Sequence, residues 1–200
     1  MSYNLQNIYT AEPLCSGTVS VAPLGTAMPT DPLTELSEVS ELWTDLGFTG
    51  ADGFMEKNDR QITLKRAFGG NAVKTLQSEY SATLEFTFLE SLNADVLAAV
   101  FGSTNVVVTA ATSNHGTQIA VYKNSRKLPH QCWVINTWDD ELNAVYRNAV
   151  ANGQIIQVAE IKVVHTDVIE YKITLECFES SVCAADNIVT YTDNGIWLGS

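Results

Sequence analysis

The feature that most constrains the fold is the stretch from Gln154 to Phe178, which has the pattern of two consecutive β-strands. In its first half β-branched residues dominate, and the polar tripeptide His165-Thr166-Asp167 separates the halves. In its second half apolar residues alternate with mostly polar ones, so successive side chains point to opposite faces of an extended backbone. We therefore predict one long antiparallel hairpin with an apolar and a polar face. The alternating apolar residues are Ile169, Tyr171, Ile173, Leu175 and Cys177.

The same alternation occurs between Tyr80 and Glu90, which predicts another long strand. Because an isolated hairpin is marginally stable in water, these strands must belong to a larger sheet whose apolar face is covered. Their polar face carries few charges, and long strands of this kind occur in proteins that assemble through their sheets. An ordinary solvated sheet face fits the pattern equally well. The polar positions are Thr83, Glu85, Thr87, Thr174 and Glu176.

Shorter strand patterns fill most of the remaining chain, and one segment has clear helical spacing. Asn93 is a suitable N-cap for a helix that Gly102 would end. Asn152-Gly153 predicts a hairpin turn, as does Gly69-Gly70-Asn71. About ten candidate strands and one short helix predict an all-β fold, either a sandwich or a barrel. Besides the 154–178 hairpin, the candidate strands are 17–23, 43–48, 62–68, 72–78, 80–90, 105–109, 118–123, 130–138, 144–150 and 188–191.

Composition fits one globular domain with an arm at each end. The chain of 200 residues is 46% hydrophobic and 17% charged, which permits a sizeable core. We find no secretion leader and no apolar run near the roughly 20 residues that span a bilayer, so we expect a soluble protein that is not exported and has no membrane partner. We predict an N-terminal arm at 1–16, the β-domain at 17–178 and a C-terminal arm at 179–200.

The segment 26–59 is unusually acidic and is predicted to form a long loop. It holds eight acidic residues against one basic residue, Lys57. Apolar residues near helical spacing allow a short helix at 33–41, and a structured loop fits equally well. Acidity also characterises the whole chain, whose net charge is −12. Since DNA-binding proteins neutralise phosphates with Lys and Arg, this charge disfavours a protein that grips DNA, whereas a surface that DNA must pass without sticking is compatible with it.

No constellation typical of an enzyme is present, and we expect no catalysis, cofactor or metal. The sequence lacks a phosphate-binding glycine loop, a GxSxG nucleophile elbow and an HExxH zinc motif. Asp139-Asp140-Glu141 could bind a divalent cation, but a solvated reversal between strands explains it better. The four cysteines form no CxxC pair, so we expect free thiols, and a Cys177–Cys183 bridge remains an alternative. The cysteines are Cys15, Cys132, Cys177 and Cys183.

A series of short motifs in a fixed order resembles the major tail tube proteins of long-tailed phages of actinobacteria. The motifs extend over roughly residues 17–178, and their collinear order is more specific than any one of them. Phe68 stands where the family pattern has tryptophan, and the two terminal arms lie outside the motifs. The matching runs are Ala22-Pro23-Leu24-Gly25-Thr26-Ala27, Pro29-Thr30-Asp31, Trp43-Thr44-Asp45-Leu46-Gly47, Asp52-Gly53, Phe68-Gly69-Gly70, 73–79, 86–90, 93–97 and 161–177.

The resemblance implies a β-sandwich subunit that forms hexameric rings, stacked into a tube around a tape-measure protein and later conducting DNA. It implies a virion protein assembled in the host cytoplasm, with tail tip and terminator proteins as further partners. One sheet of each copy would join a shared inner β-barrel, for which we choose the 80–90 strand and the 154–178 hairpin. The lumen-facing residues would be Thr83, Glu85, Thr87, Thr174 and Glu176. Contacts between subunits and rings would use Asp31, Leu33, Leu36, Trp43, Ile8 and Tyr9.

Two other classes of protein remain as alternatives. The first is the tube of a contractile tail or of a bacterial secretion device, which would share the fold. The second is a β-sandwich that binds carbohydrate or a protein partner, with exposed tryptophans as sugar platforms. We favour core or interface packing for these tryptophans, because large aromatic side chains dominate the energetics of both environments. They are Trp43, Trp133, Trp138 and Trp197.

Overall fold

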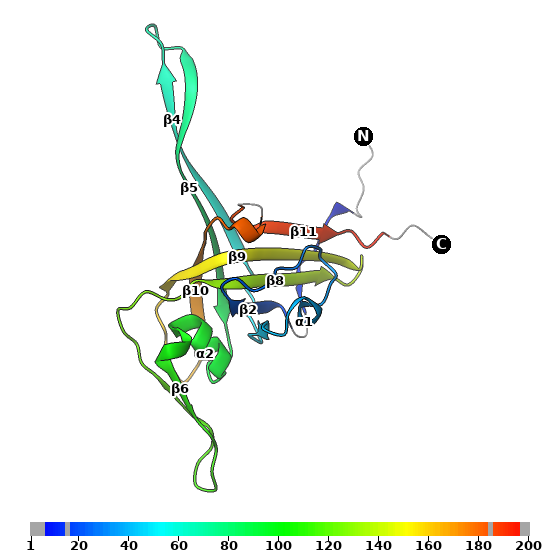
Figure 1. Ribbon diagram of the computed structural model, residues 1–200, viewed down its shortest axis with the longest axis vertical. Coiled ribbons are helices and arrows are strands. Elements are labelled where there is room, and N and C mark those ends of the chain that lie inside the picture. Colours follow the sequence, from blue (N-terminus) through cyan, green and yellow to red (C-terminus); the bar gives the residue numbers. More distant parts are fainter. Residues whose placement is uncertain (1–6, 15–16, 184–185, 197–200) are drawn as a thin grey trace.

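The computed structural model describes residues 7–14, 17–183 and 186–196 and is built mostly of β-strands (Figure 1). Within these ranges, no helix is both long and apolar enough to cross a membrane. The strands are β1 (Glu12–Pro13), β2 (Val19–Pro23), β3 (Thr44–Asp45), β4 (Met55–Arg66), β5 (Ala72–Phe88), β6 (Val106–Thr109), β7 (Gln118–Val121), β8 (Gln131–Asp139), β9 (Ala144–Val158), β10 (Tyr171–Cys177) and β11 (Val189–Asp193). The helices are α1 (Leu36–Val39) and α2 (Ala94–Phe101), with 3-10 turns at Ser103–Asn105 and Ser181–Cys183.

One nine-stranded sheet organises the chain, in the order β3-β2-β8-β9-β10-β5-β4. Strand β9 is its centre, because it pairs with β8 and β11 over its first part and with β10 over its last part. The predicted pairing within 154–178 is confirmed, since Cys177 lies opposite Gly153 and Ile173 opposite Val158. The connection is longer than expected, because β9 ends at Val158 and β10 begins at Tyr171.

The core lies between the two parts of this bent sheet, which makes the fold sandwich-like and not a closed barrel. Apolar side chains of β5 and β10 pack against those of β2, β8 and β9 in one cluster. Trp133 is fully buried within it, and its ring lies 6.2 Å from that of Phe86. Helix α2 contributes its apolar face to the same cluster, as its spacing predicted, and the Asn93 side chain caps it by accepting a bond from the Asp95 amide. The all-β fold with a short helix is therefore confirmed.

Two β-hairpins project from opposite ends of this sandwich (Figure 1). The larger one, residues 60–80, consists of the distal parts of β4 and β5 around the predicted Gly69-Gly70-Asn71 turn, and we call it the arm hairpin. Every residue from Met55 to Tyr80 is exposed in the single chain. Strands β4 and β5 both continue from the arm hairpin into the sheet of the sandwich, where residues 55–59 of β4 pair with residues 81–85 of β5.

Two local predictions from the sequence were wrong. The Asn152-Gly153 turn does not form, because β9 runs straight through these residues. Gly153 is needed there for space, since a Cβ atom would lie 2.8 Å from Trp133 Cδ1 and 3.1 Å from Leu175 Cδ1. The predicted loop at 26–59 was also too long. Its last residues, from Met55 to Asp59, belong to β4 and pair with β5, which no apolar alternation in this stretch revealed.

Candidate assembly surfaces

The predicted lumen residues gather on one face of β4, β5 and β10. Glu176 lies opposite Thr83 on the neighbouring strand, and Thr174 lies opposite Glu85. All four side chains are half-buried in the single chain. Thr87 differs because it is only 7% exposed, with the backbone of Gly50 running alongside and donating a hydrogen bond to its carbonyl. The structure therefore brings four of the five residues together on an open surface.

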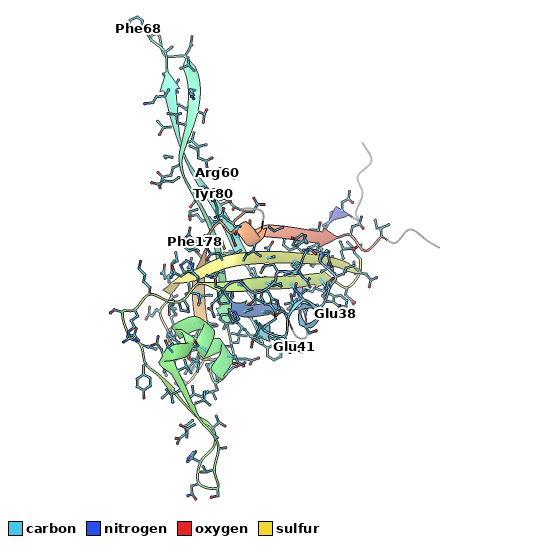
Figure 2. All side chains as sticks on the ribbon, viewed as in Figure 1. Glu38, Glu41, Arg60, Phe68, Tyr80 and Phe178 are labelled. Atoms are coloured by element: carbon cyan, nitrogen blue, oxygen red, sulfur yellow. The ribbon has the colours of Figure 1, made fainter. Side chains whose placement is uncertain are left out.

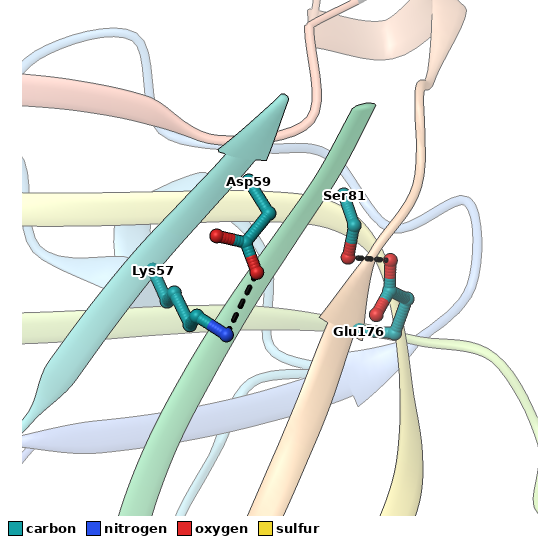
Figure 3. Close-up of polar contacts among 4 residues, drawn as sticks. All are labelled: Lys57, Asp59, Ser81 and Glu176. Carbon is teal, nitrogen blue, oxygen red and sulfur yellow. Dashed lines mark hydrogen bonds and ion pairs between the residues drawn. The ribbon is translucent and has the colours of Figure 1, made fainter. Parts of the chain in front are cut away.

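Charges on this polar face are paired, which makes it close to neutral. Ser81 donates a 2.8 Å hydrogen bond to the Glu176 carboxylate, and Lys57 lies 2.7 Å from Asp59 (Figure 3). The hydrogen bond with Asp59 raises the pKa of Lys57. Lys172 also lies 3.8 Å from Glu85. Since exposed ion pairs of this kind stabilise a fold weakly, they serve mainly to keep the face hydrated and low in net charge.

The arm hairpin was not identified as a functional surface by sequence reasoning, although it is the largest exposed element. Ile62 and Leu64 on β4 share one face with Val73 on β5, and all three are exposed. At the tip, Phe68 is completely exposed (Figure 2). At the base, the Arg60 guanidinium lies 4.4 Å from the centre of the Tyr80 ring. No distinctive sequence signal marks this element, because an exposed strand needs no regular alternation of apolar and polar residues.

The acidic segment wraps one side of β8 and β9, where a buried arginine holds it. Arg147 Nε donates to Asn136 at 2.7 Å, and its Nη1 donates to the carbonyls of Asp31 and Thr34 at 2.9 and 2.8 Å. Burial lowers the pKa of Arg147, and the carboxylates of Asp31 and Glu35 oppose that shift. Sequence reasoning missed this residue, because nothing local distinguishes a buried arginine in a strand from an exposed one.

The four predicted contact residues in this segment have different environments. Asp31 caps the turn before α1 by accepting bonds from Thr34 and the Leu33 amide, and these bonds lower the pKa of its carboxyl. Leu36 is buried and Trp43 packs beside it against a second apolar cluster on β8 and β9. Leu33 remains half-exposed. Leu33, Leu36 and Trp43 line one groove, together with the carboxylate-bearing residues Glu35, Glu41 and Asp45.

The N-terminal arm lies partly on its own sandwich. Tyr9 donates a 2.9 Å hydrogen bond to Thr137, and burial raises the pKa of its phenol. Asp139 accepts a 2.7 Å bond from the Thr10 amide, so the first residue of the suspected cation motif serves as an anchor for the arm. Ile8, in contrast, is exposed and has room for a contact with another molecule.

The tryptophans offer little support for a carbohydrate platform. Trp133 is in the core, and Trp43 donates from Nε1 to the Ala27 carbonyl while packing on the second cluster. Trp138 is half-buried on β8, and Trp197 lies outside the described residues. Among the cysteines, Cys132 and Cys177 are buried free thiols whose pKa values are raised by burial, whereas Cys15 and the Cys183 side chain lie outside the described part. The Cys177–Cys183 bridge considered above is therefore absent.

Comparison with known proteins gives one decisive match. No curated protein sequence matches the chain. Two solved structures resemble it at 10% identity, each covering 94% of this chain and 98% of its own: the tube-terminating cap of an anti-feeding prophage, with a TM-score of 0.45, and a sheath–tube complex of an extracellular contractile injection system, with a TM-score of 0.39. The sequence model of a family described as phage tail tube protein matches residues 1–191. On this last match, which spans nearly the whole sequence, the chain belongs to the phage tail tube protein family.

Proposed function

We propose that copies of this tail tube subunit close into rings of six, as the family resemblance implies, and that the rings stack into a tube that conducts DNA. The observation that carries this proposal is the asymmetry of the sheet formed by β4, β5 and β10. One face is packed into the core, whereas the opposite face is polar and uncovered. Strand β4 also ends the sheet with an open edge, and joining such edges around an axis removes them in a closed barrel.

In this proposal the polar face lines the lumen. Thr83, Glu85, Thr174 and Glu176 would face the channel, with Lys57 and Lys172 offsetting the carboxylates. A hydrated surface with little positive charge gives phosphate groups nothing to bind, so DNA would slide past it. The lumen would thus be polar and weakly charged. Thr87 would contribute through packing beneath Gly50 and not through contact with the channel.

The remaining parts of the chain would serve assembly and carry no chemistry of their own. Residues 17–178 would form the ring-building domain, and the arms at 1–16 and 179–200 would join neighbouring copies, with Ile8 as an exposed contact. A long-tailed phage of actinobacteria is the source that the motifs favour, with a tape-measure protein inside the tube and tip and terminator proteins at its ends. Assembly would take place in the host cytoplasm before the tail joins the virion.

Electron microscopy of the concentrated protein tests this function directly. We expect hollow cylinders of stacked rings, since a subunit with an open edge and a complete core needs only other copies to assemble. A protein that stays monomeric at about 1 mM, far above the dissociation constants of specific interfaces, would contradict the proposal.

A labelling experiment tests the orientation of the polar face. Cysteine replaces Thr174, and the variant is treated with a small maleimide and with a maleimide attached to a bulky polymer. We expect both to react with the monomer, but only the small one to react within the assembled tube. A cysteine in place of Asp140, which is exposed at the end of β8, provides the control and should react with both reagents in both states. Equal labelling of Thr174→Cys by the bulky reagent in both states would place this face outside the lumen.

A further inference from the structure

We infer that the tip of the arm hairpin of one copy docks into the groove beside α1 on a second copy, held by charge complementarity around a central aromatic contact. The groove beside α1, here called the α1 groove, has a volume of about 540 Å³ and is lined by Leu33, Glu35, Leu36, Glu41, Trp43 and Asp45 among others. This inference rests on the proposed function, because it assigns the two surfaces through which successive rings would meet.

The arm hairpin carries a charge opposite to that of the rest of the chain. Residues 60–80 contain four basic residues and one acidic residue, a net charge of +3, which leaves −15 for the remainder. The basic residues of the arm hairpin are Arg60, Lys65, Arg66 and Lys74. Residues 1–56 contain eight acidic residues and no lysine or arginine. The lining of the α1 groove carries three carboxylates, of Glu35, Glu41 and Asp45, against one guanidinium, of Arg147, so its net charge is opposite to that of the arm tip.

The pairing of β4 with β5 gives separate evidence that the arm tip binds an anionic surface. Lys65 and Lys74 lie directly opposite each other on β4 and β5. Like charges at such positions destabilise an isolated hairpin. Across the described ranges of the chain, neither lysine has a carboxylate within salt-bridge distance. A carboxylate-rich partner would remove this repulsion, and the chain itself presents such a surface.

The apolar parts of the two surfaces also match. Phe68 is completely exposed at the end of the arm hairpin, flanked by Gly69 and Gly70, which add no side chain that would hinder its insertion. Leu36, Trp43 and the half-exposed Leu33 contribute apolar surface to the α1 groove, whose buried lining also includes Asn136 and Arg147. Its rim carries Glu35 and Glu41, which are exposed. An aromatic anchor within a ring of charges is a common arrangement at protein interfaces.

The arm hairpin points away from the α1 groove of its own copy. The arm hairpin that enters the groove must therefore belong to another copy. The arm hairpin extends roughly 26 Å from Arg60 to Phe68, at about 3.3 Å per residue, and points away from the sandwich. In Figure 2, Phe68 lies at one end of the molecule, and Glu38 and Glu41 lie on the opposite side of the sheet. The arm hairpin and the α1 groove are different surfaces, so their contact is heterologous. Two joined copies therefore keep one free arm tip and one free α1 groove for further copies. Contacts of this kind extend into stacks.

Charge reversal tests the pairing. The arm variant K65E/R66E/K74E and the groove variant E35K/E38K/E41K should each raise the protein concentration needed for tube formation at least about tenfold, since like charges would face each other. Tube formation should return when the two variants are mixed, because the basic tips of the groove variant then meet the acidic grooves of the arm variant. A single chain carrying all six substitutions should also assemble. The substituted side chains are all exposed, and a denaturation curve confirms that each variant is folded.

Matched controls separate the pairing from the effect of net charge. The variant R126E/K127E/K162E reverses three exposed basic residues outside the arm hairpin and should form tubes at about the same protein concentration as the wild type. A defect in this control as large as that of the arm variant, or failure of the mixture of arm and groove variants, would overturn the inference. Wild-type cylinders together with undisturbed assembly of the arm variant would leave the proposed function standing and refute the pairing alone. Absence of cylinders from the wild-type protein would refute both.

A photo-crosslink identifies the docking site directly. The aromatic photo-crosslinker p-benzoylphenylalanine replaces Phe68, and assembled tubes are irradiated and analysed by mass spectrometry. We expect crosslinks to residues 31–45 of another copy. Crosslinks to a different cavity, the one lined by Tyr9, Phe54 and Ile135, or to the sandwich of the same copy, would contradict the inference. Retention of a DNA duplex by the wild-type protein that is lost in the arm variant, with tube formation unchanged, would make the arm hairpin a nucleic-acid contact instead.

Discussion

The two halves of strand β5 form one continuous strand in two different environments. From Ala72 to Tyr80 every side chain is exposed, whereas from Ser81 to Phe88 apolar residues alternate into the core. The inner half is covered by β10 and by the apolar cluster, and the outer half has only β4 beside it. A two-stranded hairpin without a covered face is marginally stable in water. The sandwich therefore buries its apolar side chains within one copy, whereas the apolar side chains of the arm hairpin can be buried only by a partner.

This contrast explains how one chain can be both a folded monomer and a building block. The core fixes the geometry of the inner half of β5, and the strand continues from there to the arm hairpin. An interface that is absent from the single copy can then form without refolding of the sandwich. The following substitutions compare the two regions, beginning with the largest expected effect.

The largest difference is expected between two phenylalanines. Phe86 is 2% exposed and contacts the rings of Phe54, Phe88 and Trp133, whereas Phe68 is fully exposed. We expect Phe86→Ala to lower the free energy of unfolding by about 3–5 kcal/mol because it leaves a cavity. Phe68→Ala should change it by less than about 0.5 kcal/mol. Denaturant unfolding of the monomer measures both, and similar losses would erase the proposed distinction between the regions.

Two arginines sharpen the comparison for polar contacts. Arg147→Ala removes three hydrogen bonds of a buried guanidinium, two of which hold the segment before α1, and we expect the free energy of unfolding to fall by about 2–4 kcal/mol. Arg60→Ala removes a contact to Gln77 and the stacking on Tyr80 at an exposed position, for which we expect less than about 1 kcal/mol. Denaturant unfolding gives both values, and hydrogen exchange should show faster exchange at 31–36 only in Arg147→Ala. An Arg60→Ala variant as unstable as Arg147→Ala would show that the arm hairpin supports the sandwich.

Two glycines compare the packing density of the sandwich core with that of the smaller hairpin, formed by β6 and β7. A Cβ atom at Gly153 would press on Trp133 and Leu175, so Gly153→Ala should cost about 1–3 kcal/mol. Gly116, at the end of the smaller projecting hairpin, has no neighbour within 4 Å of a built Cβ atom, and Gly116→Ala should stay within about 1 kcal/mol of the wild type. Thermal unfolding of the pair provides the measurement. A neutral Gly153→Ala would mean that the core adjusts more freely than its packing indicates.

The smallest expected effect concerns acid pH. The hydrogen bonds that Asp31 accepts from Thr34 and from the Leu33 amide lower the pKa of its carboxyl. Their stabilisation is complete above the ordinary aspartate pKa of about 4 and is lost as the pH falls through the lowered value. The protection factors of the amides at 31–36, which correct for the slower intrinsic exchange in acid, should therefore fall below about pH 4 in the wild type. Asp31→Asn should lack this acid-dependent step, and its persistence in that variant would assign it to another group.

Much of the sandwich could be predicted because its signals are local. The alternation at 169–177 and the cap at Asn93 each depend on residues close together in sequence, and both predictions were confirmed. Asn152-Gly153 misled for the opposite reason. Its turn chemistry is local, but the need for a glycine comes from Trp133, twenty residues away in the chain and adjacent in space.

The assembly surfaces were harder to predict, because they combine segments that only the fold relates to one another. The polar positions of 83–85 and 174–176 were identified by alternation, and the structure brings them together. The clamp by Arg147 and the exposure of the arm hairpin had no comparable signal. An exposed strand needs no regular pattern, and a buried arginine is recognised only through the distant carbonyls that it binds.

Hydrogen exchange of the monomer and of the assembled tube provides the most direct test of the central claim. We expect amides in 60–80 to exchange rapidly in the monomer, while those in 81–88 are strongly protected. Upon assembly, exchange in 60–80 should slow at least about tenfold, with little change in 81–88. The claim is that the sandwich is stable by itself, whereas the arm hairpin is stabilised by another copy. Equal protection of both halves of β5 in the monomer, with no change in the tube, would contradict it.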